Sequence, residues 1–366
     1  MGNNLLIITG NMGSGGLERV TANVANEYAK MGWNVKILSL LDPKQKVFVS
    51  LHSNVELSFF DGFYKKRFPT KLGKIFLTKK WISFIKKEIN LFEPDTVLCM
   101  TLKICALTCI ACKRHKDVRI VMREISDPKS KDRSQFENAI CFRICKHVDH
   151  IIFQTNWEKS CYPKNLRDKG SVVPNPAEVK TVAVSPLNKI VTMGRLCISQ
   201  KSQDVLLDAF SIFIKNKPSF TLEIYGEGPD KQIIENMIKE KGLEKNVFLK
   251  GAVKTVHESI KDAMIFVLPS EYEGLSNALI ESMIMGLPCI SSNWHGVEDL
   301  IEHKQNGLLF QRGDYKQLAS EMLLLSEDIA LRKMLIENSA PLKERLSFAN
   351  IFPLYRRAIE GDICDE

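Results

Sequence analysis

The feature that most constrains this sequence is the regular alternation of short, apolar, β-rich runs with longer stretches of helical periodicity. Such runs are typical of strands buried on both faces of a parallel sheet, and the stretches between them are long enough for crossover helices. The runs that we predict as strands are residues 5–9, 35–41, 95–100, 119–122, 150–154, 189–194, 221–226, 264–269 and 288–292. The sequence therefore predicts an α/β fold with parallel sheets.

The length of the chain favours two such domains rather than one large sheet. It has 366 residues, 45% of them apolar, which is enough for two separate cores. The segment 174–188 contains three prolines and little helical periodicity, so we place the boundary near residue 185. We expect Rossmann-like domains over 1–185 and 186–345, followed by a C-terminal helix over 346–366 that packs back on the first domain.

Neither a secretory signal nor a membrane-spanning run is expected. The N-terminus lacks a basic start and a cleavage site, and charged residues interrupt every later apolar stretch. The ten cysteines are scattered through apolar and helical stretches, so we expect reduced thiols in a cytoplasm. Cys105, Cys109 and Cys112 share one helical face, Cys109 and Cys112 form a CxxC, and His115 is a nearby fourth ligand for zinc, but we favour buried structural cysteines over a metal site.

Charge is distributed unevenly along the chain. The formal net charge is +8, yet residues 1–180 carry 30 Lys and Arg against 17 Asp and Glu. The remaining residues carry 21 against 26. The N-terminal half is therefore expected to face an anionic partner.

A glycine-rich turn, GNMGSGGLERV (10–20), follows the first predicted strand and opens a helix. With Asp42 after the second strand it could be a dinucleotide-binding fingerprint, but the glycine spacing does not match that motif. A tight turn that needs glycine only for its backbone geometry is one alternative. The other is that Gly15 and Gly16 allow backbone to approach a phosphate or sugar across an interdomain cleft.

The strongest chemical signal is EYEGLSNALIESMIMGLP, which begins at Glu271 after a predicted strand. Glu273 falls in the strand-to-helix turn and Glu281 lies two turns into the helix that begins near Ser276. Carboxylates accept hydrogen bonds from sugar hydroxyls, and the free N–H groups of a helix start attract anions. The alternative is that both acids are solvated.

Basic and glycine residues follow two more predicted strands. Arg195 and Lys201 in GRLCISQKSQD could meet one diphosphate from two sides, although solvated loop charges would have the same pattern. Gly226 and Gly228 in YGEGPDK suit a tight turn with close backbone approach.

The order GRL…QK, YGEGP, EGLSNALIE and NGLLF (306–310) resembles family 4 of the retaining glycosyltransferases, which have the GT-B fold: two Rossmann-like domains with parallel sheets that face a central cleft. The resemblance covers most of residues 189–312, and GGLERV (15–20) fits it more loosely. It implies a donor nucleotide-sugar in the C-terminal domain, an acceptor in the N-terminal domain, and neither a metal nor a resident cofactor.

The resemblance also implies roles for individual residues. Glu281 would bind the ribose hydroxyls of the donor, and Glu273 would bind the transferred sugar. Arg195 and Lys201 would neutralise the leaving diphosphate, and loss of either would raise the barrier by about 2–4 kcal/mol. The donor contacts include backbone or side chains of Gly226, Gly274, Leu275, Ser276 and Asn277, together with Gly15 and Gly16.

One N-terminal motif departs from the family pattern. The strand 119–122 is followed by Arg123 and Glu124 where many relatives have a histidine near the reacting sugar. Glu124 is therefore a catalytic candidate, and a structural Arg123–Glu124 pair is the alternative. Asn175, in PNP, either faces the cleft or is a turn residue.

A basic amphipathic segment covers residues 63–89, with nine Lys and Arg from Lys65 to Lys87 and apolar residues at helical spacing. It suits an anionic membrane surface, or else its apolar stripe is core and its lysines are solvated. No nucleic-acid-binding module accompanies the charge, so we do not expect nucleic acid as a partner. With the resemblance, this favours a lipid-linked saccharide acceptor and a peripheral enzyme on the inner face of the membrane.

The sequence thus favours a metal-independent, retaining transfer from a nucleotide-sugar, with UDP as the favoured nucleotide because UDP-sugars are common among the relatives. In a front-face route the leaving phosphate would assist deprotonation of the acceptor, which explains the absence of an obvious carboxylate pair. A nucleotide-sugar epimerase or hydrolase of the same fold stays an alternative. An NAD-dependent oxidoreductase is disfavoured because it leaves the C-terminal motifs unexplained.

Overall fold

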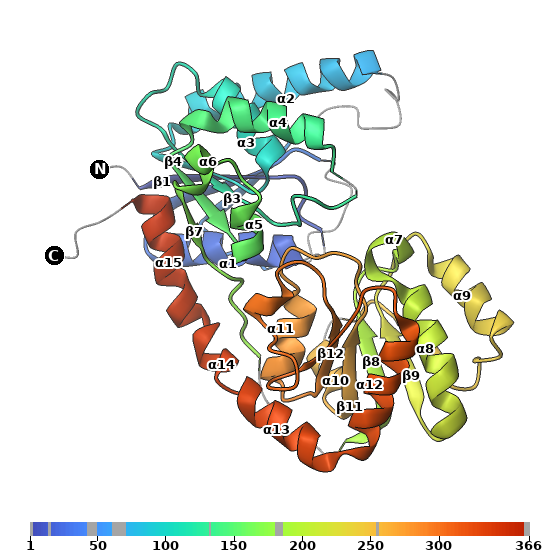
Figure 1. Ribbon diagram of the computed structural model, residues 1–366. Helices are drawn as coiled ribbons and strands as arrows, with labels where there is room; N and C mark the ends of the chain where they lie inside the picture. The colour runs from blue at the N-terminus through green and yellow to red at the C-terminus, as the bar shows by residue number, and fades with distance from the viewer. Residues whose placement is uncertain are drawn as a thin grey trace. The chain divides into compact units, whose positions relative to one another are not determined.

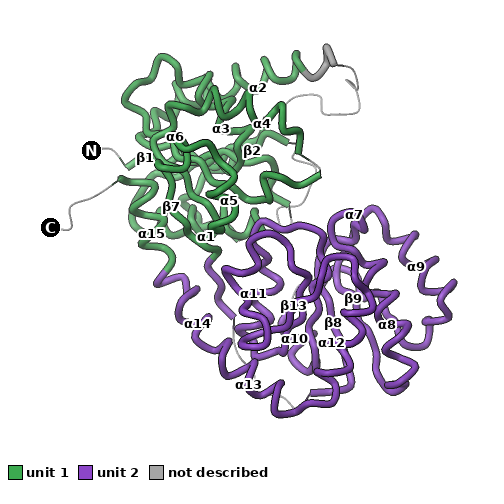
Figure 2. Tube along the Cα trace, viewed as in Figure 1, with its two compact units in different colours: residues 1–175, 351–366 green, residues 176–350 purple. Residues whose placement is uncertain are grey.

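The computed structural model describes residues 3–13, 16–41, 50–60, 71–131, 133–179, 186–253 and 256–361. The chain forms two compact units, one of residues 1–175 and 351–366 and the other of residues 176–350 (Figure 2). The chain therefore passes from one unit to the other at Asn175–Pro176, within the proline-containing segment, and returns at Asn350–Ile351.

Unit 1 is a parallel sheet with helices on both faces (Figure 1). Among its described residues the strand order is β3-β2-β1-β4-β5-β6-β7. The strands are β1 (Asn4–Thr9), β2 (Asn34–Ser39), β3 (Val55–Phe59), β4 (Thr96–Cys99), β5 (Arg119–Arg123), β6 (His150–Phe153) and β7 (Gly170–Val172). The helices are α1 (Gly16–Lys30), α2 (Lys71–Phe92), α3 (Leu102–Ala111), α4 (Gln135–Ile144), η1 (Cys145–His147), α5 (Asn156–Ser160), α6 (Lys164–Arg167) and α15 (Phe348–Glu360).

Unit 2 repeats this architecture, with the order β10-β9-β8-β11-β12-β13 among its described residues. Its strands are β8 (Leu187–Met193), β9 (Thr221–Tyr225), β10 (Val247–Gly251), β11 (Ala263–Leu268), β12 (Cys289–Ser292) and β13 (Leu308–Phe310). Its helices are α7 (Ile198–Lys201), α8 (Gln203–Asn216), α9 (Lys231–Glu240), α10 (Val256–Ile260), α11 (Asn277–Ile284), η2 (Val297–Asp299), α12 (Tyr315–Glu327), α13 (Ile329–Ser339) and α14 (Leu342–Arg345).

The predicted fold class is confirmed, and every predicted strand is present within a few residues of its expected bounds. The central strands form because both of their faces are covered: all six residues of β11 are buried. The core of unit 2 lies between its sheet and α8, α9 and α12, and Phe210 and Phe213 of α8 are fully buried in it. Burial of one such side chain contributes about 1.5–3 kcal/mol.

Helix α15 completes unit 1, although more than 170 residues separate it from the rest of that unit. The carbonyl of Ile359 accepts a hydrogen bond from Thr96 Oγ1, and that of Ala358 accepts one from Arg119 Nη2. The ring of Phe352 meets Tyr28 of α1 edge-on, with 5.5 Å between centroids. The C-terminal helix thus lies against β4, β5 and α1.

Arg123 joins three segments of unit 1. Its side chain is 1% exposed. Nε donates to Tyr355 Oη of α15 at 2.8 Å, and Nη2 donates to Asn175 Oδ1. The amide oxygen of Asn175 also accepts a bond from Gln154 Nε2 at 2.8 Å. Asn175 and α15 therefore both depend on one guanidinium at the end of β5.

We predict that Arg123→Met loosens α15 from unit 1. The substitution keeps an apolar stem but removes the Arg123 donor from Tyr355 Oη and leaves Asn175 Oδ1 with its bond from Gln154, at a cost of about 1–3 kcal/mol. Hydrogen exchange should show faster exchange of the α15 amides than in wild type. Arg143→Met, at an exposed position of α4, is the control. Unchanged protection of α15 in Arg123→Met would contradict this account.

Candidate active site

The site in unit 2 lies where the strand order reverses. Strands β9 and β10 follow one another on one side of β8, while β11, β12 and β13 lie on the other side. In open parallel sheets, the loops that leave two such neighbouring strands diverge to opposite faces and open a crevice at their carboxyl ends. The loops after β8 and β11 carry the residues that the sequence predicted as donor ligands.

The loop after β11 positions Glu273. This carboxylate is 8% exposed, and its Oε1 accepts a hydrogen bond from Ser270 Oγ at 2.6 Å. Lys201 Nζ lies 2.5 Å from the same oxygen. The structure therefore brings together two predicted site residues as a partly buried ion pair, with a charge-assisted hydrogen bond between them.

The loop after β8 carries Arg195 and ends in the short helix α7. Arg195 is exposed, and its carbonyl accepts a bond from Gln203 Nε2 at 2.9 Å. Lys201 is the last residue of α7, and Ser202 after it has φ of 46°, in the left-handed region. Ser202 separates α7 from α8, and Lys201 and Ser270 line the same small cavity.

Helix α11 carries Glu281. Ser276 caps this helix, since its Oγ accepts from the N–H of Leu279 at 3.3 Å. Glu281 is 7% exposed, and its Oε2 lies 2.8 Å from His257 Nε2 of α10. No periodic pattern or motif indicated His257, which lies in a five-residue helix. Gly274, Leu275 and Ser276 are buried in the turn before α11, and Asn277 is the first residue of the helix.

Glycines allow two loops to touch at the carboxyl end of β8. Gly226 has φ of 134°, and a Cβ on it would lie 1.9 Å from the carbonyl oxygen of Gly194. A Cβ on Gly228 would lie 2.2 Å from the Leu196 carbonyl oxygen. These glycines are therefore required where the β9 loop packs on the backbone beside Arg195.

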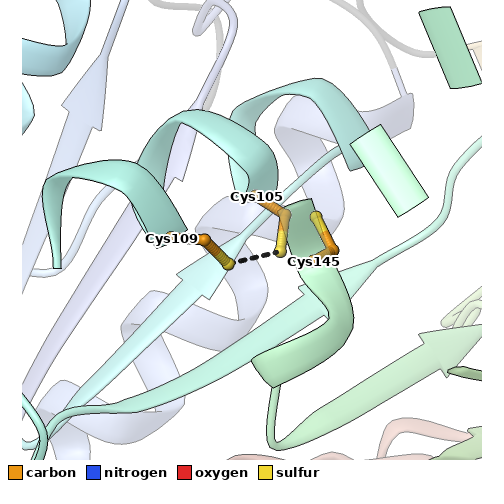
Figure 3. A group of neighbouring side chains, drawn as sticks. All are labelled: Cys105, Cys109 and Cys145. Atoms are coloured by element: carbon orange, nitrogen blue, oxygen red, sulfur yellow. Dashed lines mark hydrogen bonds between the residues drawn. The ribbon is translucent and has the colours of Figure 1, made fainter. Parts of the chain in front are cut away.

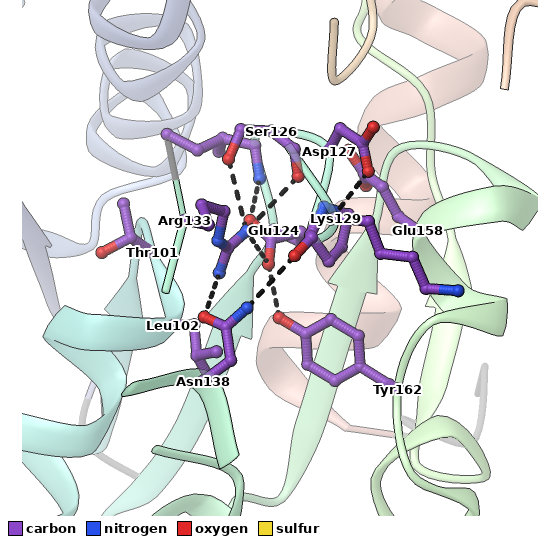
Figure 4. Close-up of polar contacts among 12 residues, drawn as sticks. Thr101, Leu102, Glu124, Ser126, Asp127, Lys129, Arg133, Asn138, Glu158 and Tyr162 are labelled. Carbon is purple, nitrogen blue, oxygen red and sulfur yellow. Dashed lines mark hydrogen bonds and ion pairs between the residues drawn. The ribbon is translucent and has the colours of Figure 1, made fainter. Parts of the chain in front are cut away.

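The N-terminal candidates lie in unit 1. Gly15 is outside the described residues, and Gly16 is the first residue of α1. Glu124 is 1% exposed. Its Oε2 accepts from Tyr162 Oη and pairs with Arg133 Nη1 at 2.9 Å, and its Oε1 accepts from the N–H of Ile125 (Figure 4).

These contacts make Glu124 the centre of a buried polar network. Burial first, and then the Glu124 charge, raise the pKa of Tyr162 well above its ordinary value. Arg123 bonds to Asn175 and Tyr355, and Glu124 bonds to Arg133, so these contacts differ from the Arg123–Glu124 pair considered from sequence. The catalytic role of Glu124 stays a prediction, and its contacts in this structure favour a structural role.

Two family descriptions match this chain. Residues 14–180 match Glycosyltransferase Family 4, and residues 178–341 match Glycosyl transferases group 1. The chain belongs to the family 4 glycosyltransferases.

Individual relatives agree with this assignment. An uncharacterised glycosyltransferase of Haemophilus influenzae is 27% identical over 354 residues, which are 89% of this chain and 96% of that protein. The Campylobacter jejuni GalNAc-alpha-(1->4)-GalNAc-alpha-(1->3)-diNAcBac-PP-undecaprenol alpha-1,4-N-acetyl-D-galactosaminyltransferase is 25% identical, with 91% of each chain covered. The structure of Anabaena HepE in complex with UDP and glucose superposes with a TM-score of 0.81 at 17% identity, over 98% of this chain and 99% of that one. This glycosyltransferase therefore has the GT-B fold.

We predict that Gly226→Ala destabilises unit 2 and displaces the Arg195 loop. The new methyl group must push the Gly194 backbone aside and also strains the positive φ, which together cost about 3 kcal/mol. Gly242→Ala is a matched control, because Gly242 has φ of 66° but no atom within 4 Å of an added Cβ. Urea unfolding of both variants should show the larger loss for Gly226→Ala. Equal losses in the free energy of unfolding would mean that the close contact of Gly226 with the Gly194 backbone adds nothing to the effect of the positive φ.

Proposed function

We propose that this glycosyltransferase moves a sugar from a UDP-sugar to a lipid-linked saccharide acceptor in bacterial surface-glycan assembly, with retention of anomeric configuration. The main support for a donor site is the contact of Glu273 with Lys201 and Ser270, in the segments that follow β8 and β11. Glu281 lies on α11, the helix after this contact. Relatives support the choice of substrates: one is named for an undecaprenol-linked acceptor, and one structural neighbour was crystallised with UDP.

Lys201 and Arg195 supply the positive charge that the leaving group needs. Cleavage of the donor bond places negative charge on the β-phosphate, and cations that meet this charge more strongly in the transition state lower the barrier. In this structure the ammonium of Lys201 pairs with Glu273. A diphosphate would compete for that ammonium, while Arg195 is exposed at the other end of the same loop. These two cations take the role that a metal ion has in other transferases.

Glu273 and Glu281 supply acceptors for hydroxyl groups. An ionised carboxylate only accepts hydrogen bonds, and its two oxygens can accept several, so each can hold sugar hydroxyls beside the protein contacts described above. We assign the ribose of the donor to Glu281, whose position is fixed by His257, and the transferred sugar to Glu273. For the transfer we favour the front-face route, in which the departing phosphate oxygen takes the proton of the acceptor hydroxyl. A covalent sugar trapped on either carboxylate would contradict this route.

We predict that UDP binds without metal and that Glu281→Gln weakens this binding at least tenfold. Loss of hydrogen bonds from hydroxyls to a charged group costs about 1.5–3 kcal/mol. Calorimetric titration of UDP, GDP and ADP, in EDTA and then with magnesium, measures the effect. Glu240→Gln, an exposed acid at the end of α9, is the control.

Either of two results would contradict the proposed donor site: no nucleotide binds, or Glu281→Gln binds UDP as tightly as the control variant. Tight binding of NAD in a parallel titration would favour the oxidoreductase alternative. If UDP binds as expected, the products formed from a UDP-sugar distinguish transfer from epimerisation or hydrolysis.

The acceptor side rests on a basic and apolar surface of unit 1. Helices α2 and α4 both pack against α3, so they lie on one side of the sheet (Figure 1). On α2, Ile85 and Ile89 are buried in the core, whereas Ile75 and Phe76 are exposed. On α4, Phe136 is 76% exposed. The first part of the predicted basic segment, residues 63–70, lies outside the described residues.

These positions divide the predicted apolar stripe of the segment. Its C-terminal part is buried in the core, in agreement with the alternative that the stripe is core. Its N-terminal part exposes large apolar side chains beside exposed lysines. We propose that this surface docks on an anionic membrane. None of the described helices is long and apolar enough to span a bilayer.

We predict that replacing four exposed lysines of α2 by glutamine weakens binding to anionic vesicles at least tenfold. Each lysine near headgroups contributes about 1 kcal/mol. The set is Lys79, Lys80, Lys86 and Lys87. A vesicle co-sedimentation series with rising phosphatidylglycerol content measures the affinity. The control replaces four exposed lysines of unit 2, which are Lys215, Lys239, Lys245 and Lys333. Equal binding of both variants would refute the docking surface.

A further inference from the structure

Three thiols meet in the core of unit 1, whereas the proposed donor site belongs to unit 2. Cys105 and Cys109 lie one turn apart on α3, and Cys145 is the first residue of η1 (Figure 3). The three sulfur atoms all lie within 4.8 Å of one another, and 4.0 Å separates those of Cys105 and Cys109. The group therefore joins two elements whose cysteines are 36 and 40 residues apart in sequence.

This group differs from the one considered from sequence. The CxxC pair of Cys109 and Cys112 is not the pair that converges, because Cys112 ends α3 as its C-cap. Spacing of four residues on a helix places Cys109 directly above Cys105 instead. Cys145 could not be assigned to the group from sequence, because only the packing of η1 against α3 brings it there.

The geometry points to a zinc site formed by Cys105, Cys109 and Cys145. A tetrahedral zinc ion with bonds of about 2.3 Å to sulfur separates its sulfur ligands by about 3.8 Å. The observed separations therefore require shifts of about 1 Å or less to reach the ligand geometry of zinc. Packing alone explains why each thiol is in an apolar core, but it does not require three of them to converge on one point.

The chemistry of the donor set favours a divalent, thiophilic ion. All three ligands are soft sulfur atoms, which select zinc or Cu(I) over magnesium or calcium. Three thiolates leave a net charge of −1 with a divalent ion and −2 with Cu(I), and the larger charge is costlier in apolar surroundings. Cys105 and Cys145 are fully buried and Cys109 is half-buried, so an ion would enter beside Cys109.

Cys99, at the end of β4, interacts with the Cys105 thiol, so a further sulfur lies near the group. A bound ion would fasten α3 to η1 and so stabilise unit 1, with no part in the sugar transfer.

The test measures zinc binding by the reduced full-length chain. The chain is first stripped of metal with EDTA and dialysed, and zinc is then added. We expect one zinc per chain by metal analysis, and near-ultraviolet sulfur-to-cobalt charge transfer when Co²⁺ replaces zinc. Competition with a chromophoric chelator should show at least hundredfold weaker zinc binding by Cys109→Ser and Cys145→Ala. Cys141→Ser, which removes a half-buried thiol of α4 outside the group, should stay within threefold of wild type.

Because Cys109 is half-buried, Cys109→Ser is expected to fold, and its metal-free thermal unfolding should match that of the wild type. Zinc should raise the unfolding temperature of the wild type but not of Cys109→Ser. A wild type that retains no zinc, or a Cys109→Ser variant that binds zinc as tightly as Cys141→Ser, would overturn the site. These readouts do not depend on UDP binding or transfer, so their outcome is separate from that of the proposed function.

Discussion

The structure depends on one constraint: parallel strands covered on both faces leave little room for polar chemistry except at their ends. Every residue of β11 is buried, and so is most of β1, β4 and β8. Charged side chains of the candidate site are therefore expected at or after the carboxyl ends of these strands, where helix starts also lie. In unit 2, Glu273 lies in the loop after β11, and Lys201 and Glu281 lie on the helices that follow β8 and β11. In unit 1, Arg123 is the last residue of β5 and Glu124 follows it.

The same constraint explains which parts of the fold could be predicted. The central strands have continuous apolar runs, and all of them were predicted from sequence. The four missed strands, β3, β7, β10 and β13, are the two edges of each sheet. An edge strand is only partly covered, as the burial of β3 and β10 shows, so its sequence mixes polar and apolar residues and gives a weaker pattern.

The candidate site was predictable as residue types at strand ends but not as contacts. The motifs indicated Arg195, Lys201, Glu273 and Glu281, yet the pairing of Lys201 with Glu273 joins the end of α7 to the loop after β11. The contact between His257 and Glu281 joins α10 to α11, and the three thiols join η1 to α3. Such contacts are set by how elements pack, and packing is not encoded in local spacing.

The composition of unit 1 has a consequence for how the protein is made. This unit needs its first 175 residues and also α15, most of which is synthesised after unit 2. Unit 2 is continuous in sequence, so all of its strands and helices are available earlier than the complete set of unit 1. During synthesis, the part of the N-terminal sheet that α15 covers stays uncovered until α15 has been made. Until then, Arg123 also lacks its hydrogen bond to Tyr355. Synthesis of α15, rather than of the N-terminal residues, is then the event that closes the first unit.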